Sequence, residues 1–196
     1  MMLRMVLILF ALTLGSALAA PVASDASEAD ALAQARTAAQ EFSTRLRSAL
    51  QVRMQADGPI GAIDFCHDEA PRIAAAVMAE RGVRLGRVAV PGRERNSANV
   101  AQDWQAAALA TFVHNVEAGA APSTQLMVQR ENLPAGVALR MARGIEVEAP
   151  CLACHGRSVA APVAAAIARH YPADAATGFD IGDLRGALWV EVPAQP

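Results

Sequence analysis

Cys151-Leu152-Ala153-Cys154-His155 is the stretch of this sequence around which the rest of the chain can be interpreted. The spacing Cys-x-x-Cys-His is the attachment motif of a c-type haem. Two thiols three residues apart can reach both vinyl groups of one haem, and the histidine that follows can give a nitrogen ligand to its iron. Pro150 restricts the backbone just before the motif, and Gly156 lets the chain turn just after it.

The same motif is compatible with a thiol–disulfide redox pair or a zinc site, and it could also arise by coincidence from the composition of the chain. A redox Cys-x-x-Cys usually opens a helix after a strand within a βαβ pattern, and no such pattern surrounds Cys151. A zinc site normally has a second pair of ligands, and Cys66 is the one remaining cysteine. We therefore expect one covalent haem bound through Cys151 and Cys154, with His155 as the proximal iron ligand.

Residues 1–19 predict a secretory signal peptide and therefore a periplasmic location. Arg4 provides the charged start, an apolar run over residues 5–14 is too short to span a bilayer, and Ala17-Leu18-Ala19 has the small residues of a cleavage site. Haem is attached to such motifs on the outer side of the bacterial inner membrane, so the signal agrees with the motif. Retention of the uncleaved segment as an anchor is the alternative that we favour less. We expect no membrane span in the mature chain.

Composition limits the partners that this chain can have. Cleavage after Ala19 leaves 16 basic residues against 19 acidic ones, which argues against nucleic acid as a partner. Aromatic residues make up only 4% of the chain, so a haem would add apolar bulk to a modest core. All 17 basic residues are arginine, so any ion pair with a haem propionate must come from an arginine.

The N-terminal part of the mature chain predicts helices. Residues 20–30 are small and polar and predict a flexible start, which leaves residues 31–196 as one domain. Helical periodicity is visible over residues 31–55 and 60–80, with Asp57-Gly58-Pro59 as a break between them. We expect Pro71 to kink or split the second helix, because proline has no amide hydrogen to donate.

Strands with shorter helices between them are expected in the remainder of the chain. The expected elements are a strand over 83–90, a short helix that opens at Asp103-Trp104, strands over 125–130 and 137–147 joined by a hairpin, a helix over 162–170 and a last strand over 187–192. Helices first, and then strands joined by a hairpin, predict an α+β domain with a mainly antiparallel sheet.

Two neighbouring residues of the second helix are candidates for a distal iron ligand. Cys66 is the cysteine left over by the haem motif, and it is also the type of residue that packs in a protein core. His67 follows it and is also expected on the helix surface. Helical spacing puts each of them on an apolar face, so it does not choose between them; the neighbours on these faces are Ile60, Ile63, Ala70, Ile73, Ala74 and Val77. His114 and His170 are expected on ordinary helix surface.

Several separate stretches of the chain resemble one family, the periplasmic single-haem c domains with a PAS-like fold, long catalogued as a domain of unknown function. These domains occur alone and as the sensing part of larger signalling proteins. The matching stretches cover almost the whole mature chain, with one departure at Ser97, where the family usually has proline. They are Gly58-Pro59, Ala62-Ile63 with Cys66 and Ala70-Pro71, Arg95-Asn96 with Asn99, Cys151 to Gly156, Tyr171 to Asp174 with Ala176 and Gly178-Phe179, and Gly182 to Ala187.

The resemblance implies a central antiparallel sheet with N-terminal and other helices around it and haem held against it. It also implies an uncommon pair of axial ligands, His155 and the thiolate of Cys66, with His67 as the rival of Cys66. Arg95 and Arg185 lie in matching motifs, and because the chain has no lysine we consider both as candidate contacts for the haem propionates.

These features predict an exported c-type cytochrome that acts as a redox or small-ligand sensor or as a low-potential electron carrier. A thiolate ligand pushes electron density onto ferric iron and so lowers the reduction potential. The alternative is an enzyme, either a haem peroxidase or a Cys-x-x-Cys thiol–disulfide oxidoreductase. A peroxidase needs an open iron site, which Cys66 would close, so we favour a protein without catalytic activity. Its redox or signalling partner is not identified by the sequence.

Overall fold

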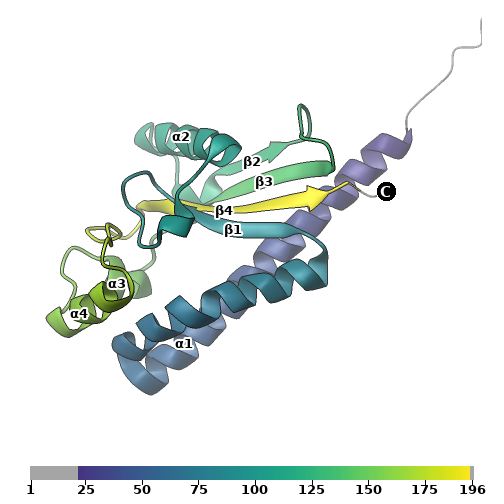
Figure 1. The fold of residues 1–196 in the computed structure, drawn as a ribbon. Coiled ribbons are helices and arrows are strands. Elements are labelled where there is room, and N and C mark those ends of the chain that lie inside the picture. The colour runs from purple at the N-terminus through teal and green to yellow at the C-terminus, as the bar shows by residue number, and fades with distance from the viewer. Residues whose placement is uncertain (1–21, 195–196) are drawn as a thin grey trace, which may run out of the picture.

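The computed structural model describes residues 22–194, so the predicted signal peptide lies outside the described residues (Figure 1). The elements are helices α1 (Val22–Arg81), α2 (Asp103–Glu117), α3 (Leu152–His155) and α4 (Ala161–His170) and strands β1 (Arg84–Ala89), β2 (Leu126–Gln129), β3 (Val137–Glu146) and β4 (Leu184–Pro193). Short 3-10 turns lie at Ser97–Asn99, Pro122–Thr124 and Ala149–Cys151. Among the described residues, no helix is both long enough and apolar enough to span a membrane.

Helix α1 is a hairpin of two arms that turns at Gly58, as the sequence predicted (Figure 1). Gly58 has φ 67° and ψ −171°, a backbone conformation that glycine adopts without a steric penalty. The arms run antiparallel, because Arg45 of the first arm bonds Glu80 of the second at 3.0 Å and Arg81 bonds Glu41 at 2.5 Å. The first arm buries an alanine-rich stripe that includes Phe42.

Two predictions about α1 were wrong. Residues 22–30, expected to be a flexible start, are helical. The chain has neither proline nor glycine between Pro21 and Asp57, so nothing stops the helix from extending back to Val22. Pro71 does not split the second arm, which has helical backbone angles there. The carbonyl group that loses its partner belongs to His67, which is exposed, so water can bond it.

The four strands form one antiparallel sheet in the order β1-β4-β3-β2. The α1 hairpin covers one face of the sheet and α2 covers the other (Figure 1). Central strand β4 gives alternate residues to both faces: Leu188, Val190 and Val192 pack with α1, and Ala187 and Trp189 pack with α2. This arrangement confirms the predicted α+β class with a PAS-like sheet flanked by helices, including the β2–β3 hairpin.

Three segments leave or enter the sheet at the same end. Ala89, the last residue of β1, and Ile145, near the end of β3, both pair with Gly186, near the start of β4. The loop after β1, the haem motif after β3 and the segment before β4 therefore start or finish beside one another. The second arm of α1 reaches the same region, since α1 packs against α4. The candidate site lies where these segments meet.

Candidate functional site

The Cys-x-x-Cys-His motif forms a single helical turn directly after the 3-10 turn that ends at Cys151. Cys151 and Cys154 are free thiols and are both half-buried. The turn closes tightly at Gly156, where a Cβ atom would lie 2.7 Å from the carbonyl oxygen of Leu152. Gly156 has an extended backbone (φ −71°, ψ 179°), so the reason for glycine is space rather than the turn that the sequence suggested.

The backbone of the motif is anchored to the segment that precedes β4. The amide groups of Gly178 and Phe179 each donate a hydrogen bond of 3.0 Å, to the carbonyl oxygens of Gly156 and His155 respectively. These two hydrogen bonds fix the position of the motif, although the segments that they join are more than twenty residues apart in the sequence.

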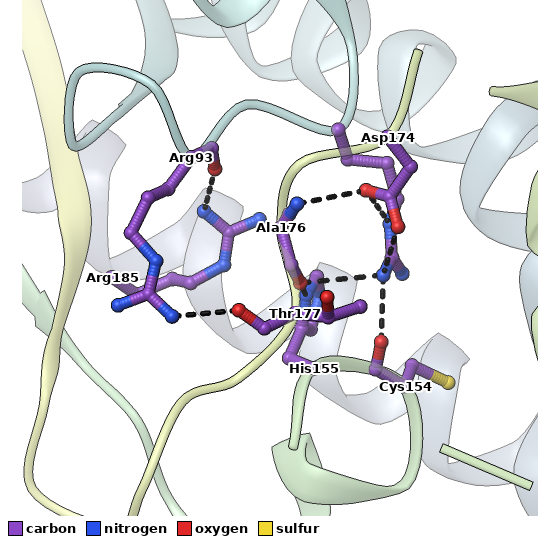
Figure 2. Close-up of polar contacts among 8 residues, drawn as sticks. Arg93, Cys154, His155, Asp174, Ala176, Thr177 and Arg185 are labelled. Atoms are coloured by element: carbon purple, nitrogen blue, oxygen red, sulfur yellow. Dashed lines mark hydrogen bonds and ion pairs between the residues drawn. The ribbon is translucent and has the colours of Figure 1, made fainter. Parts of the chain in front are cut away.

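The ring of His155 is oriented for binding a metal through Nε2. Its Nδ1 lies 2.6 Å from the carbonyl oxygen of Ala176, and because a carbonyl can only accept, Nδ1 must carry the proton (Figure 2). Nε2 is then left with its lone pair, which is the arrangement of a metal-ligating histidine. Phe179 holds the ring edge-to-face, with 6.4 Å between the centroids.

His155 is also neutral, as a metal ligand must be. Burial lowers its pKa to about 3, and the positive charges of Arg185 and Arg95 act in the same direction. At neutral pH the imidazole is thus uncharged, and no proton has to leave Nε2 before a metal can bind there.

Arg95 ties the haem motif to the loop before β4, and its partners Cys154, Asp174 and Ala176 are labelled in Figure 2. Its guanidinium bonds the carboxylate of Asp174 at 3.0 and 3.3 Å and donates to the carbonyl oxygens of Cys154 at 2.6 Å and Ala176 at 3.4 Å. Asp174 also accepts from the amide of Ala176 at 3.0 Å. Arg95 and Asp174 are only 12% and 11% exposed. The pair therefore fixes the very carbonyl group that orients His155.

Arg185 occupies a bulge in β4. Ile145 of β3 pairs with Gly186 and Glu146 pairs with Leu184, so Arg185 is the extra residue between two consecutive pairs. Side chains of a regular strand point alternately to the two faces of the sheet, and a bulge changes the direction of the side chain at that position. Gly186 makes this possible: it has φ 154°, and a Cβ atom there would lie 2.0 Å from the carbonyl oxygen of Val88.

The bulge places Arg185 in a cationic layer around Phe179. The guanidinium carbon of Arg93 lies 3.4 Å from the centroid of the Phe179 ring and that of Arg185 lies 5.1 Å from it. Arg185 donates to the carbonyl oxygen of Arg93 at 3.3 Å, and Arg93 donates to that of Thr177 at 2.6 Å (Figure 2). Among the described residues, no carboxylate pairs with Arg185. Burial, with the charges of Arg95 and Arg87, lowers its pKa to about 10.

Cys66 and His67 lie in different surroundings, a distinction that helical spacing did not provide. Cys66 is half-buried, and burial raises the pKa of its thiol while the charge of Arg87 acts in the opposite direction. Cys154 packs against a buried cluster that includes Ile63, one helical turn before Cys66 on the same helix, so the thiol lies on the side of the haem motif. It is therefore the better placed of the two for a group attached there.

His67 is turned toward helix α4 and solvent. Its ring stacks on that of His170 with 4.6 Å between the centroids and meets Tyr171 at 5.6 Å. Nδ1 of His67 lies 2.7 Å from a carboxylate oxygen of Asp68, and the side chain of His67 is 43% exposed.

The two other histidines were expected on ordinary helix surface. Nε2 of His170 lies 2.7 Å from a carboxylate oxygen of Asp64 of α1, so this residue links α4 to α1. His114 is exposed, as expected.

The donor set present here fits a haem of the c type. Two free thiols at the attachment spacing, a neutral histidine with Nε2 unprotonated and a further thiol on the same side meet the needs of attachment and of two axial ligands. Arg185 supplies a cation without a carboxylate partner among the described residues. The propionate contacts predicted for Arg95 and Arg185 stay predictions.

Several functional residues were not selected from the sequence. Asp174 and Phe179 stood in a family-like motif, so a signal for them existed, but their partners were not foreseen. The carbonyl of Ala176 left no signal, because any residue type offers the same acceptor. Arg93 and Arg87 were not selected, although Arg87 sits at an inward position of a predicted strand.

The fold and the site define an α+β protein of the PAS-like class that carries a Cys-x-x-Cys-His motif at one end of its sheet. The sequence model of the Tll0287-like family matches residues 23–193, and the chain belongs to this family. This confirms the resemblance seen in the sequence.

One solved structure supports the same relationship. The crystal structure of the cyanobacterial haem protein Tll0287 is similar at 26% sequence identity, with a TM-score of 0.53. The similarity covers 78% of this chain and 92% of that protein. No curated protein matches this chain significantly.

Proposed function

We propose that this protein is an exported c-type cytochrome with one haem attached through Cys151 and Cys154 and bound at iron by His155 and Cys66. The observation that carries the proposal is the hydrogen bond from Nδ1 of His155 to Ala176, which leaves Nε2 as a ready ligand beside two free thiols. The similar protein Tll0287 is a haem protein, which supports the same assignment. Haem, when bound, supplies a one-electron redox centre.

The two proposed iron ligands favour a low reduction potential and a closed site. The carbonyl acceptor on Nδ1 increases the basicity of His155. Burial alone keeps the thiol of Cys66 protonated, but a ferric ion favours the thiolate form. Two protein ligands would leave no open position on the iron, which fits a redox or small-ligand sensor or a low-potential electron carrier.

The enzymatic alternatives have less support. A thiol–disulfide oxidoreductase needs a cysteine with a lowered pKa, whereas burial raises the pKa of Cys154. A peroxidase needs an open iron position, and the thiol of Cys66 lies on the side of the haem motif. We propose a periplasmic location on the predicted signal peptide, and a separate redox or signalling protein as the partner.

The proposal is tested by expressing the full chain in a bacterium with an intact haem-attachment system. Denatured protein on a gel should keep haem-dependent peroxidase staining. The double variant Cys151→Ala/Cys154→Ala should lose the stain, whereas Cys66→Ala should keep it. Colourless wild-type protein would refute the proposal. Oxidised and reduced absorption spectra then show whether the iron has six ligands, as a carrier or sensor requires, or an open position, as an enzyme requires.

A further inference from the structure

Within residues 22–194, the arginines around the motif outnumber the carboxylates that pair with them. Arg185 lies beside the end of β1, because Ala89 pairs with Gly186 and the amide of Val90 donates a hydrogen bond of 3.4 Å to the carbonyl oxygen of Arg185. Arg87 precedes Ala89 by two residues on the same strand. Asp174 is the acidic partner at this place, and Arg95 already holds it in two hydrogen bonds. Neither Arg87 nor Arg185 forms an ion pair with any of the residues that the structure describes.

Arg87 projects from β1 toward the α1 hairpin. Leu85, two residues earlier, packs in the core on that face, while Gly86 and Val88 lie on the α2 face. The guanidinium carbon of Arg87 lies 5.8 Å from the centroid of the Phe42 ring, which belongs to the first arm of α1. Strand geometry and this contact agree on the direction of the side chain.

Arg87 has no anionic partner among the residues that the structure describes. It takes part in no ion pair there, whereas neighbouring Arg84 bonds Glu191 at 3.3 Å on the opposite face of the strand. Arg87 is exposed, so its guanidinium is accessible to a ligand.

Two arginines that have no carboxylate partner among the described residues, on neighbouring strands that meet the haem motif at the same end of the sheet, predict a ligand with two negative groups. Guanidinium groups bind carboxylates in paired hydrogen bonds, and a cation held by protein without a counter-ion is unfavourable. Arg95 differs, since both Nε and Nη2 are engaged by Asp174 and by backbone carbonyl groups.

We propose that Arg87, together with Arg185, binds the carboxylate groups of the haem, and that Arg95 is a positioning residue for the motif instead of a propionate ligand. This rests on the proposed function. It assigns a role to Arg87, a residue that was not selected from the sequence.

The test uses the haem-loaded full chain with Arg87→Leu, Arg87→Lys and Arg84→Leu as the matched control. Resonance Raman spectra report the bending band of the haem propionates, and a redox titration reports the potential. Arg87→Leu should shift the propionate band and move the ferric–ferrous equilibrium at least tenfold toward ferric, a fall of about 59 mV for a one-electron couple. Arg87→Lys should shift the band with a smaller change in potential, because the charge is kept and the fork is lost. Arg84→Leu should change neither.

The outcomes separate this proposal from the proposed function. An unchanged propionate band in Arg87→Leu would overturn the role of Arg87, even if the potential moved, since the charge would then act on Cys66 instead. A shift of the band in Arg95→Leu but not in Arg87→Leu would return the contact to Arg95. In either case haem staining of the denatured protein would still support the cytochrome. Absence of covalent haem in wild type would instead refute the proposed function itself.

Discussion

The Arg95–Asp174 pair offers a test of how the site is held together. Asp174→Asn keeps the shape of the side chain but removes its charge, so Arg95 is left without a counter-ion in a region that also contains Arg185. Both side chains are about nine-tenths buried, at 12% and 11% exposure. Breaking a buried ion pair by removing one partner costs about 3–5 kcal/mol, and the residual exposure here places the expected loss near the lower limit, at about 3 kcal/mol.

Thermal unfolding of the haem-loaded protein measures this loss. For a domain of this size, 1 kcal/mol corresponds to a change of roughly 2–4 °C in Tm, so Asp174→Asn should lower Tm by roughly 6–12 °C. The double variant Arg95→Leu/Asp174→Asn should lose less than the sum of the single variants, because it contains no unpaired charge.

Arg157 and Asp180 provide the control, since they form an ion pair at 2.5 Å with side chains that are 70% and 54% exposed. Water and salt screen exposed pairs, so Asp180→Asn should lower Tm clearly less than Asp174→Asn does. If the two carboxylate variants lowered Tm equally, burial would not be what gives the Arg95 pair its importance, and its role in positioning His155 would lose its physical basis.

Two further predictions concern the distal ligand and the bulge. Cys66→Ala should abolish a thiolate-type low-spin signal in ferric electron paramagnetic resonance and raise the potential, whereas His67→Ala should do neither; the opposite pattern would make His67 the ligand. Gly186→Ala should destabilise the protein severely or prevent folding, because its Cβ atom would lie 2.0 Å from the carbonyl oxygen of Val88. Gly136→Ala, where no atom lies within 4 Å of the added Cβ, should cost only the strain of φ 81° and keep the haem spectrum; equal losses would argue against the close contact.

The elements of the fold could be predicted because their causes are local. Gly58 next to Pro59 breaks α1 whatever surrounds it, and the alternation of residues 137–147 predicts a strand from its own pattern. Local reasoning also explains the wrong prediction for Pro71. Proline was expected to interrupt the helix because it leaves one carbonyl group without a hydrogen-bond donor. Whether water can bond that carbonyl group depends on its exposure, and only the folded chain determines that exposure.

The geometry of the site depends on contacts that a sequence pattern does not contain. The motif predicts that His155 binds iron, but the acceptor that fixes its ring is a backbone carbonyl of Ala176, and all residue types share that group. Likewise, the bulge that re-aims Arg185 follows from a mismatch of register between β3 and β4. Such a mismatch belongs to two strands that lie about forty residues apart, so neither strand alone reveals it.

The choice between Cys66 and His67 shows where helical periodicity stops being informative. Each residue has apolar neighbours at helical spacing, so the sequence of α1 supports both. The difference comes from other elements. The rings of His170, at the end of α4, and of Tyr171 contact His67, while Cys154 of the haem motif packs against a cluster that includes Ile63, one helical turn before Cys66. Adjacent residues on a helix point about 100° apart, so both cannot face the same iron. The packing of α4 against α1 therefore favours Cys66 as the distal ligand that we propose, and a variant that loosened the contacts of His67 with α4 would be expected to weaken that preference.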